Sequence, residues 1–133
     1  MKTMKSLWMV LFVPLLFWRC AGTQPIVMIT SENVIPPVEE KPEYEIDIID
    51  PGFETWFLTQ WNQAKDNSYK FYDTWNDRYV QAWNFKATHP RYSRFFNSTI
   101  NYDVTEDYGM EVSRKLYYYF KYVETELKIP ILT

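Results

Sequence analysis

Two carboxylates, Asp50 and Glu54, lie four positions apart around the turn Asp50-Pro51-Gly52. Such a pair could perform acid/base chemistry or hold a cation in a cleft. A structural role explains the same residues, because Asp50 can cap the turn and the following helix while Glu54 lies near the positive end of that helix. We favour the structural role, so the sequence predicts no catalytic residue here.

A second acidic cluster, Asp103, Glu106 and Asp107, offers the oxygen ligands that Ca²⁺ prefers. The glycine and terminal glutamate that an EF-hand loop requires are missing, and helix capping explains the cluster without a cation. The whole chain holds one His and one Cys, which disfavours a transition-metal site. We therefore predict no metal and no cofactor.

The only histidine, His89, is a residue type suited to general-base work near neutral pH. No serine or cysteine nucleophile lies in an elbow motif beside it, and Pro90 follows it directly. We expect a histidine in a surface loop. A small hydrolase that uses Asp50, Glu54 and His89 stays open as the alternative function.

Asn76 interrupts an aromatic helix face formed by Tyr72, Trp75, Tyr79 and Trp83, which follow one another at +3, +4 and +4. This stretch is predicted to be the central helix of the domain. A buried amide needs partners, such as tyrosine hydroxyls or backbone groups of a neighbouring strand, because leaving it unpaired costs about 1 to 3 kcal/mol. We favour this structural role over the alternative that Asn76 opens onto a ligand cleft.

From Glu43 onward the sequence contains 22 Phe, Tyr and Trp residues. Some must be exposed, because a domain of this size leaves roughly a third of its unfolded-chain surface in contact with water. Tyr117, Tyr118 and Tyr122 lie off the apolar stripe of the last predicted helix. Exposed aromatic rings stack on sugars or anchor protein interfaces, so we predict these three as binding residues. A tyrosine-rich core with hydroxyls that reach solvent is the alternative.

The first 22 residues resemble an export signal, with Lys2 and Lys5 before about a dozen apolar residues from Leu7 to Trp18. This run is shorter than the roughly 20 residues that a transmembrane helix needs. Cys20 stands at the end of this run, after Arg19, as a cysteine does in lipoproteins, and predicts a lipid anchor in the membrane. Arg19 argues against lipidation, and cleavage after a small residue beyond Cys20 remains the alternative.

The chain carries 14 Lys and Arg against 17 Asp and Glu, a net charge of -3. Without Lys2, Lys5 and Arg19 of the leader, 11 basic residues remain and the net charge becomes -6. A nucleic-acid-binding protein needs a basic face that neutralises phosphates. The charge balance therefore argues against a nucleic-acid partner.

We predict three segments: a leader (1–22), a Pro-rich linker (23–42) and an α+β domain (43–133). Ile26 to Ile29 could alternatively pair as a short edge strand. Within the domain, alternation predicts strands over 43–49 and 96–103, and a short helix is expected over 53–61. Long helices are expected from a cap at Asn67 or Ser68 to Lys86, and over 107–127. The predicted fold is a small two-stranded sheet packed against two long helices and one short helix.

Several blocks between Glu43 and Glu124 resemble a family of small uncharacterised exported lipoproteins, with a domain of unknown function, from Bacteroidetes-type bacteria. They include Asp50-Pro51-Gly52-Phe53-Glu54-Thr55-Trp56, Tyr79-Val80 with Trp83-Asn84, Asn101-Tyr102-Asp103 and Asp107-Tyr108-Gly109-Met110-Glu111-Val112. The resemblance implies an envelope location and an α+β domain, and it supplies no activity or cofactor. The chain departs from the pattern at Arg19, at Ser113 and at His89, where the family usually has Asn at the last two.

Together these observations predict an exported cell-envelope protein, tethered to the membrane through its N-terminal anchor or otherwise periplasmic. We expect a noncatalytic binding or assembly module whose aromatic surface meets an envelope protein or a glycan. The small hydrolase remains the alternative.

Overall fold

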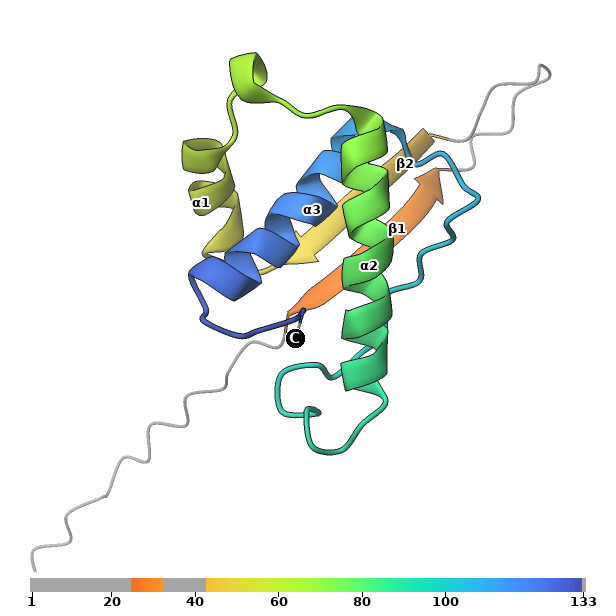
Figure 1. Cartoon of the computed structure of the whole chain (residues 1–133), viewed down its shortest axis with the longest axis vertical. Coiled ribbons are helices and arrows are strands. Elements are labelled where there is room, and N and C mark those ends of the chain that lie inside the picture. Colours follow the sequence, from red (N-terminus) through yellow and green to blue (C-terminus); the bar gives the residue numbers. More distant parts are fainter. Residues whose placement is uncertain (1–24, 33–42, 133) are drawn as a thin grey trace, which may run out of the picture.

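The computed structural model describes residues 25–32 and 43–132, which form an α+β fold as predicted (Figure 1). The leader, Cys20 and residues 33–42 of the predicted linker lie outside the described part. In chain order the elements are β1 (Ile26–Glu32), β2 (Glu43–Ile49), α1 (Phe53–Gln60), the 3-10 helix η1 (Gln63–Lys65), α2 (Tyr69–Ala87) and α3 (Gly109–Thr125).

β1 and β2 form an antiparallel two-stranded sheet in which Ile26 pairs with Ile49. Side chains alternate between its faces, so Val27 and Ile46 are buried against the helices, whereas Ile26, Met28 and Ile49 are exposed on the outer face. β1 lies in the range predicted as a linker, so the alternative that this segment forms a strand is confirmed. The folded domain therefore begins before Glu43.

The predicted strand over 96–103 is wrong, because the structure has a loop there. The backbone groups of this loop bond to α2 side chains instead of a strand. Asn84 Oδ1 accepts a hydrogen bond from Ile100 N at 2.7 Å, Asn84 Nδ2 donates to Ile100 O at 2.8 Å, and Trp83 Nε1 donates to Ser98 O at 2.9 Å. The apolar alternation in this stretch instead marks residues such as Ile100 that point into the core.

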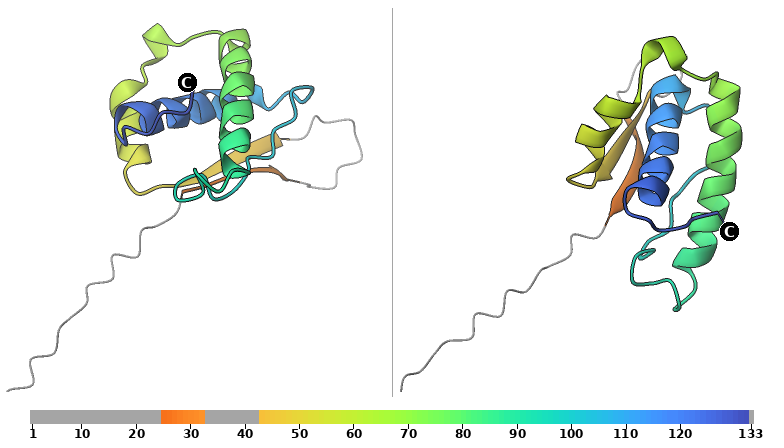
Figure 2. Two further views of the ribbon diagram at one scale, coloured as in Figure 1. Left: turned by 60° about the horizontal axis from the view of Figure 1, so that its bottom comes forward. Right: turned by 60° about the vertical axis from the view of Figure 1, so that its left-hand side comes forward.

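α3 is the central helix of the domain, and it contacts β2, α1 and α2. Figure 2 shows the sheet on one side of α3, α2 on the other and α1 beside it. The expectation that the Tyr72-to-Asn84 helix is central is therefore wrong. α3 has buried residues over a wide arc, Val112, Ser113, Leu116, Tyr119, Phe120, Tyr122 and Val123, because three elements pack around it.

The helix ends follow the predicted capping chemistry in part. Ser68 is the N-cap of α2, and its hydroxyl accepts a hydrogen bond from Phe71 N at 3.3 Å. The N-cap of α3 is Tyr108, whose side chain makes no capping bond, while Asp107 Oδ1 accepts from Gly109 N at 3.2 Å. Gly109 has a φ of +80°, a conformation that favours glycine at this sharp entry into the helix.

The C-terminal segment is held by two charged side chains, which we call the C-terminal clamp. Lys86 Nζ donates to Pro130 O at 2.6 Å, and Glu124 Oε1 accepts from Ile131 N and Leu132 N at 3.3 and 3.1 Å. The Ile131 side chain is fully buried. The end of the described chain is thus an integral part of the core.

None of the helices in residues 25–32 and 43–132 is both long enough and apolar enough to cross a membrane.

Candidate functional site

Asp50 and Glu54 have structural partners. Asp50 Oδ1 accepts hydrogen bonds from Gly52 N at 3.0 Å and from the Tyr122 hydroxyl at 3.2 Å, so it stabilises the turn after β2 and ties it to α3. Glu54 lies in the first turn of α1 and forms an ion pair with Lys115 at 3.4 Å. Asp50 therefore stabilises the turn, as the structural interpretation predicted, whereas the N-cap of α1 is Gly52 and not Asp50. Glu54 lies in the first turn of α1, as expected, and its ion pair with Lys115 adds a contact to α3.

His89 follows α2, and its side chain contacts the end of that helix. Its Nδ1 lies 2.6 Å from Phe85 O, and its ring centroid lies 4.1 Å from that of Phe85. The side chain is exposed, as expected for a surface loop. His89 has no contact with Asp50 or Glu54, so the structure does not assemble the three residues into one constellation.

The three acidic residues before α3 each make different contacts. Asp103 accepts hydrogen bonds from Thr105, which hold the pKa of its carboxyl below the ordinary value. Glu106 Oε2 accepts from the Tyr44 hydroxyl at 2.9 Å, and Asp107 lies at the start of α3. Across the described ranges, no group of three or more His, Cys, Asp and Glu residues is arranged to hold a metal ion.

Asn76 is fully buried where α2 crosses α3. Its Nδ2 donates to Ser113 O at 2.7 Å, so the partner is a helix carbonyl, whereas we expected a strand or a tyrosine hydroxyl. Asn76 Oδ1 and Ser113 Oγ are also buried, and neither has a hydrogen-bond partner among the described residues. Asn76 lines none of the cavities described below, so its observed contacts belong to the helix crossing.

The three predicted binding tyrosines have different environments. Tyr122 is only 7% exposed, so the expectation that it lies on the surface is wrong. Its ring packs on Phe53 and Trp56 of α1, with centroids 5.7 and 5.4 Å away. Tyr117 and Tyr118 are half-buried and keep part of their surface exposed.

Tyr117 and Tyr118 lie at the centre of a continuous row of half-buried rings. The ring centroids are 5.7 Å apart for Tyr117 and Tyr118, 5.4 Å for Phe57 and Tyr118, and 5.4 Å for Phe71 and Tyr117. The row runs from α1 across α3 to α2 on the helical side of the molecule. We call it the aromatic band, and its members are Trp56, Phe57, Phe71, Trp75, Tyr117 and Tyr118.

Two adjoining cavities flank the exposed ridge of α3, and together we call them the α3 groove. The first, of about 280 Å³, lies between β2 and α3 and is lined by Glu43, Tyr44, Glu45, Ile46, Glu111, Val112 and Lys115. The second, of about 300 Å³, lies between α1 and α3 and is lined by Glu54, Phe57, Trp61, Glu111, Arg114 and Lys115. Because Phe57 belongs to both the second cavity and the aromatic band, the groove and the band are continuous.

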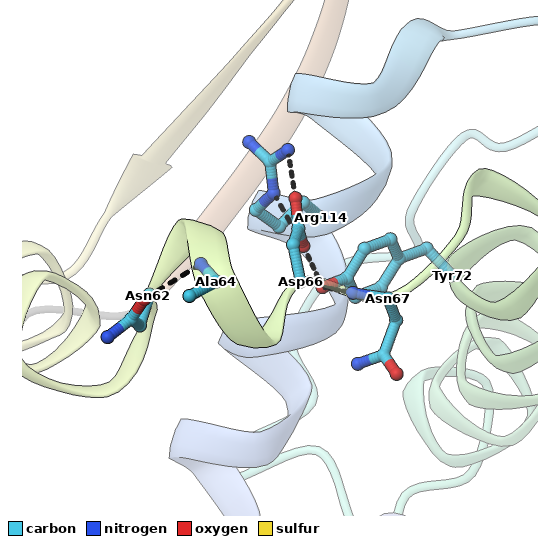
Figure 3. A network of polar contacts seen from close by, with 6 residues as sticks. All are labelled: Asn62, Ala64, Asp66, Asn67, Tyr72 and Arg114. Carbon is cyan, nitrogen blue, oxygen red and sulfur yellow. Dashed lines mark hydrogen bonds and ion pairs between the residues drawn. The ribbon is translucent and has the colours of Figure 1, made fainter.

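A polar network fixes the far end of this surface by joining the α1–α2 connection to α3 (Figure 3). Arg114 Nε and Nη2 donate to the two oxygens of Asp66 at 3.1 and 2.5 Å, and the Tyr72 hydroxyl donates to Asp66 Oδ1. The Arg114 guanidinium also covers the Trp61 ring at 4.8 Å. Bidentate pairing of this kind fixes orientation as well as distance.

The Asp66 carboxyl titrates abnormally in this network. Burial raises its pKa, but the hydrogen bonds from Arg114 and Tyr72 outweigh burial, so the pKa lies below the ordinary value. The sequence alone did not reveal this pair, because Asp66 and Arg114 are 48 positions apart.

Residues 7–132 match the family described as "Family of unknown function (DUF6146)". No curated protein and no solved structure matches the chain.

Proposed function

Because the chain belongs to DUF6146, a family of unknown function, we propose its function from its surfaces. We infer that it is a noncatalytic binding or assembly module of the cell envelope, exported and tethered to the membrane through Cys20. The aromatic band and the α3 groove together form the surface that binds the partner.

The observation that carries this proposal is that the two tyrosines at the centre of the band have partly exposed rings and hydroxyl groups without a hydrogen-bond partner among the described residues. Tyr117 and Tyr118 are half-buried, and no described residue forms a hydrogen bond with either hydroxyl. By contrast, the hydroxyls of Tyr72, Tyr79 and Tyr122 all bond to carboxylates. A ring held rigidly by neighbours with a free polar tip is the kind of group that anchors interfaces, since little conformational entropy is lost on binding.

The groove adds polar groups of both signs beside these rings. Glu54 and Glu111 carry negative charge, and Arg114 and Lys115 carry positive charge. Ligand sites typically combine an apolar floor with a few polar groups that fix orientation. The aromatic floor and charged walls of the second cavity have this composition.

The partners of the acidic residues favour binding over the hydrolase alternative. Asp50 is bonded to the β2–α1 turn and Tyr122, and Glu54 to Lys115. A general acid or base must reach the reacting atoms directly or through one water. In the described structure the His89 side chain contacts Phe85 and Thr88 and does not lie beside either carboxylate, so it cannot act with them as a general base.

We expect Tyr118→Ala to abolish capture of the partner in a crosslinked pull-down from envelope extracts. The truncation removes the ring that connects Phe57 of α1 with Tyr72 of α2, and with it the free hydroxyl. Tyr118→Phe keeps the ring contacts and should weaken capture without abolishing it.

The matched control for this experiment is Phe85→Ala. Phe85 is another aromatic residue, 58% exposed, and it lies outside the band. Capture should be unchanged in this variant, and circular dichroism should show that all three variants are folded. A partner retained equally by Tyr118→Ala and wild type would count against the band as the binding surface.

We expect Cys20→Ser to abolish partition of the mature protein into the detergent phase of a Triton X-114 separation. In a lipoprotein the lipid is joined to the protein by a thioether bond to the cysteine sulfur, and the chain contains no second cysteine that could replace Cys20. Mass spectrometry of the wild-type N-terminus should show an acylated Cys20. Unchanged partition of the variant would reject lipidation.

A further inference from the structure

We propose that the partner adds an extended strand to the free edge of β2, through a segment in which basic and apolar side chains alternate. The inference rests on the binding function proposed above and names the kind of partner that the α3 groove would accept. Three observations support it: the open edge, the cavity beside it and the charge along it.

The edge of β2 that faces away from β1 pairs with no strand in the described structure. The sheet has two strands, and β2 pairs with β1 alone. In an antiparallel pair every second residue of a strand directs its N–H and C=O groups away from the partner strand. The backbone of Glu43, Tyr44, Glu45 and Ile46 makes no further hydrogen bonds to described residues outside the sheet. These groups are a template for another strand.

A cavity lies along this open edge. Four consecutive β2 residues, Glu43 to Ile46, line the first cavity of about 280 Å³, together with three α3 residues. Consecutive strand residues point to opposite faces of a sheet, so a cavity that all four line must run past the edge of the strand and not over one face. An extended segment placed there would lie beside β2 and against Glu111, Val112 and Lys115.

The faces of β2 specify the side chains of the added strand. Glu43 and Glu45 are exposed on the outer face, whereas Tyr44 and Ile46 point inward to the core. Cross-strand neighbours on one face contact each other, and opposite charges there are favourable. The added strand should therefore place basic residues beside the glutamates and apolar residues beside Tyr44 and Ile46.

Among the described residues, no basic side chain pairs with the glutamates along the edge. No described Lys or Arg lies within 4.0 Å of a carboxylate oxygen of Glu43, Glu45 or Glu111, because Lys115 pairs with Glu54 instead. A basic segment would supply the missing counter-charges. An acidic segment would be repelled by the same three residues.

The probes that test this proposal are two short peptides added to the full-length protein: acetyl-Thr-Lys-Val-Lys-Val-Lys-Thr-amide and the same peptide with Glu in place of Lys. Binding is followed by the shifts of backbone amide signals in NMR spectra. We expect the basic peptide to bind, with the largest shifts over Glu43 to Ile46, and the acidic peptide to bind at least several-fold more weakly. Equal affinities, or no binding of the basic peptide, would overturn the proposal.

N-methylation separates strand addition from simple charge attraction. Two versions of the basic peptide carry methyl groups on alternate amides, in the odd or in the even positions. An added strand directs only one of these sets to β2, so one version should lose binding and the other should keep it. Loss in both versions or in neither would exclude strand addition.

Charge reversal in the protein completes the test. Glu45→Lys should weaken binding of the basic peptide by roughly fivefold, since one attractive cross-strand pair becomes repulsive. Glu126→Lys, the same change at an exposed position after α3, should leave it unchanged. If the envelope partner is still captured by the protein through Tyr118 while the peptides fail these tests, only the strand-addition proposal falls and the binding function stands.

Discussion

Trp83→Ala is expected to lower the free energy of unfolding by about 3 to 5 kcal/mol, as typical truncations of a buried tryptophan do. Trp83 is only 1% exposed, and its ring centroid lies 4.8 Å from that of Phe96, 6.0 Å from Tyr119 and 6.0 Å from Phe120. Truncation removes these contacts and leaves a cavity that the surrounding helices cannot fill. Urea unfolding followed by circular dichroism measures the change.

Two further variants separate the contributions to this effect. Trp83→Phe retains a ring but loses the hydrogen bond from Nε1 to Ser98 O, so it should cost less than the alanine variant and loosen the loop after α2. Phe85→Ala, two positions along the same helix, removes an exposed ring and should change stability by no more than about 0.5 kcal/mol. A cost for Trp83→Ala close to that of Phe85→Ala would contradict the assignment of Trp83 to the core.

Asp66→Asn is expected to lower the free energy of unfolding at pH 7 by about 2 kcal/mol, between the small effect of exposed ion pairs and the 3 to 5 kcal/mol for breaking buried ones. The side chains of Arg114 and Asp66 are 17% and 15% exposed, so solvent screens the pair only in part. The variant leaves the guanidinium of Arg114 without its counter-charge.

The effect of Asp66→Asn should depend on pH. The pKa of the folded Asp66 carboxyl is lowered, so between the folded value and the unfolded value of about 3.9 the unfolded chain binds more protons. Stability from this group is therefore complete above about pH 5 and is lost as the pH falls through the folded pKa. The difference between wild type and Asp66→Asn should shrink to zero as the pH falls below both pKa values, as measured by urea unfolding over a series of pH values.

Two further variants test whether the effect of Asp66→Asn comes from its pairing with Arg114. Asp47→Asn removes an exposed carboxylate from the outer face of the sheet and should have little effect at any pH. Arg114→Lys keeps the charge but loses the bidentate bonds to Asp66. Its free energy of unfolding should therefore lie between those of wild type and Asp66→Asn. A difference between wild type and Asp66→Asn that stays constant down to pH 2 would show that the carboxylate charge is not the source of the effect.

The helices could be predicted from the sequence because their signals are local. The cap at Ser68, the proline at position 90 and the apolar periodicity of α3 all act within a few residues. The strand β1 was harder to recognise, since Ile26 to Ile29 is a continuous apolar run directly after Pro25 and lacks the alternation that marks a half-buried strand. Its pairing with β2 comes from contacts between two separate segments of the chain, which no local pattern encodes.

The surface of the domain was predicted less well than its elements. Tyr122 lies off the main apolar stripe of α3, but α1 packs on that side of the helix and covers it. The pair of Asp66 and Arg114 depends on how the α1–α2 connection crosses α3, which is a tertiary feature. The aromatic band could be anticipated as an excess of rings, whereas its course over three helices needed the structure.

The position of β1 also determines how the domain bears a mechanical load. A pull on the chain before Ile26 enters the fold at the end of a strand whose hydrogen bonds to β2 run across its length. Because the antiparallel register places Ile26 beside Ile49, at the end where β2 leaves the sheet, such a pull loads the bonds at this end first and peels them apart one by one. Under such a force the sheet should be the first element to yield, and it should do so before α3 loses contact with α1 and α2.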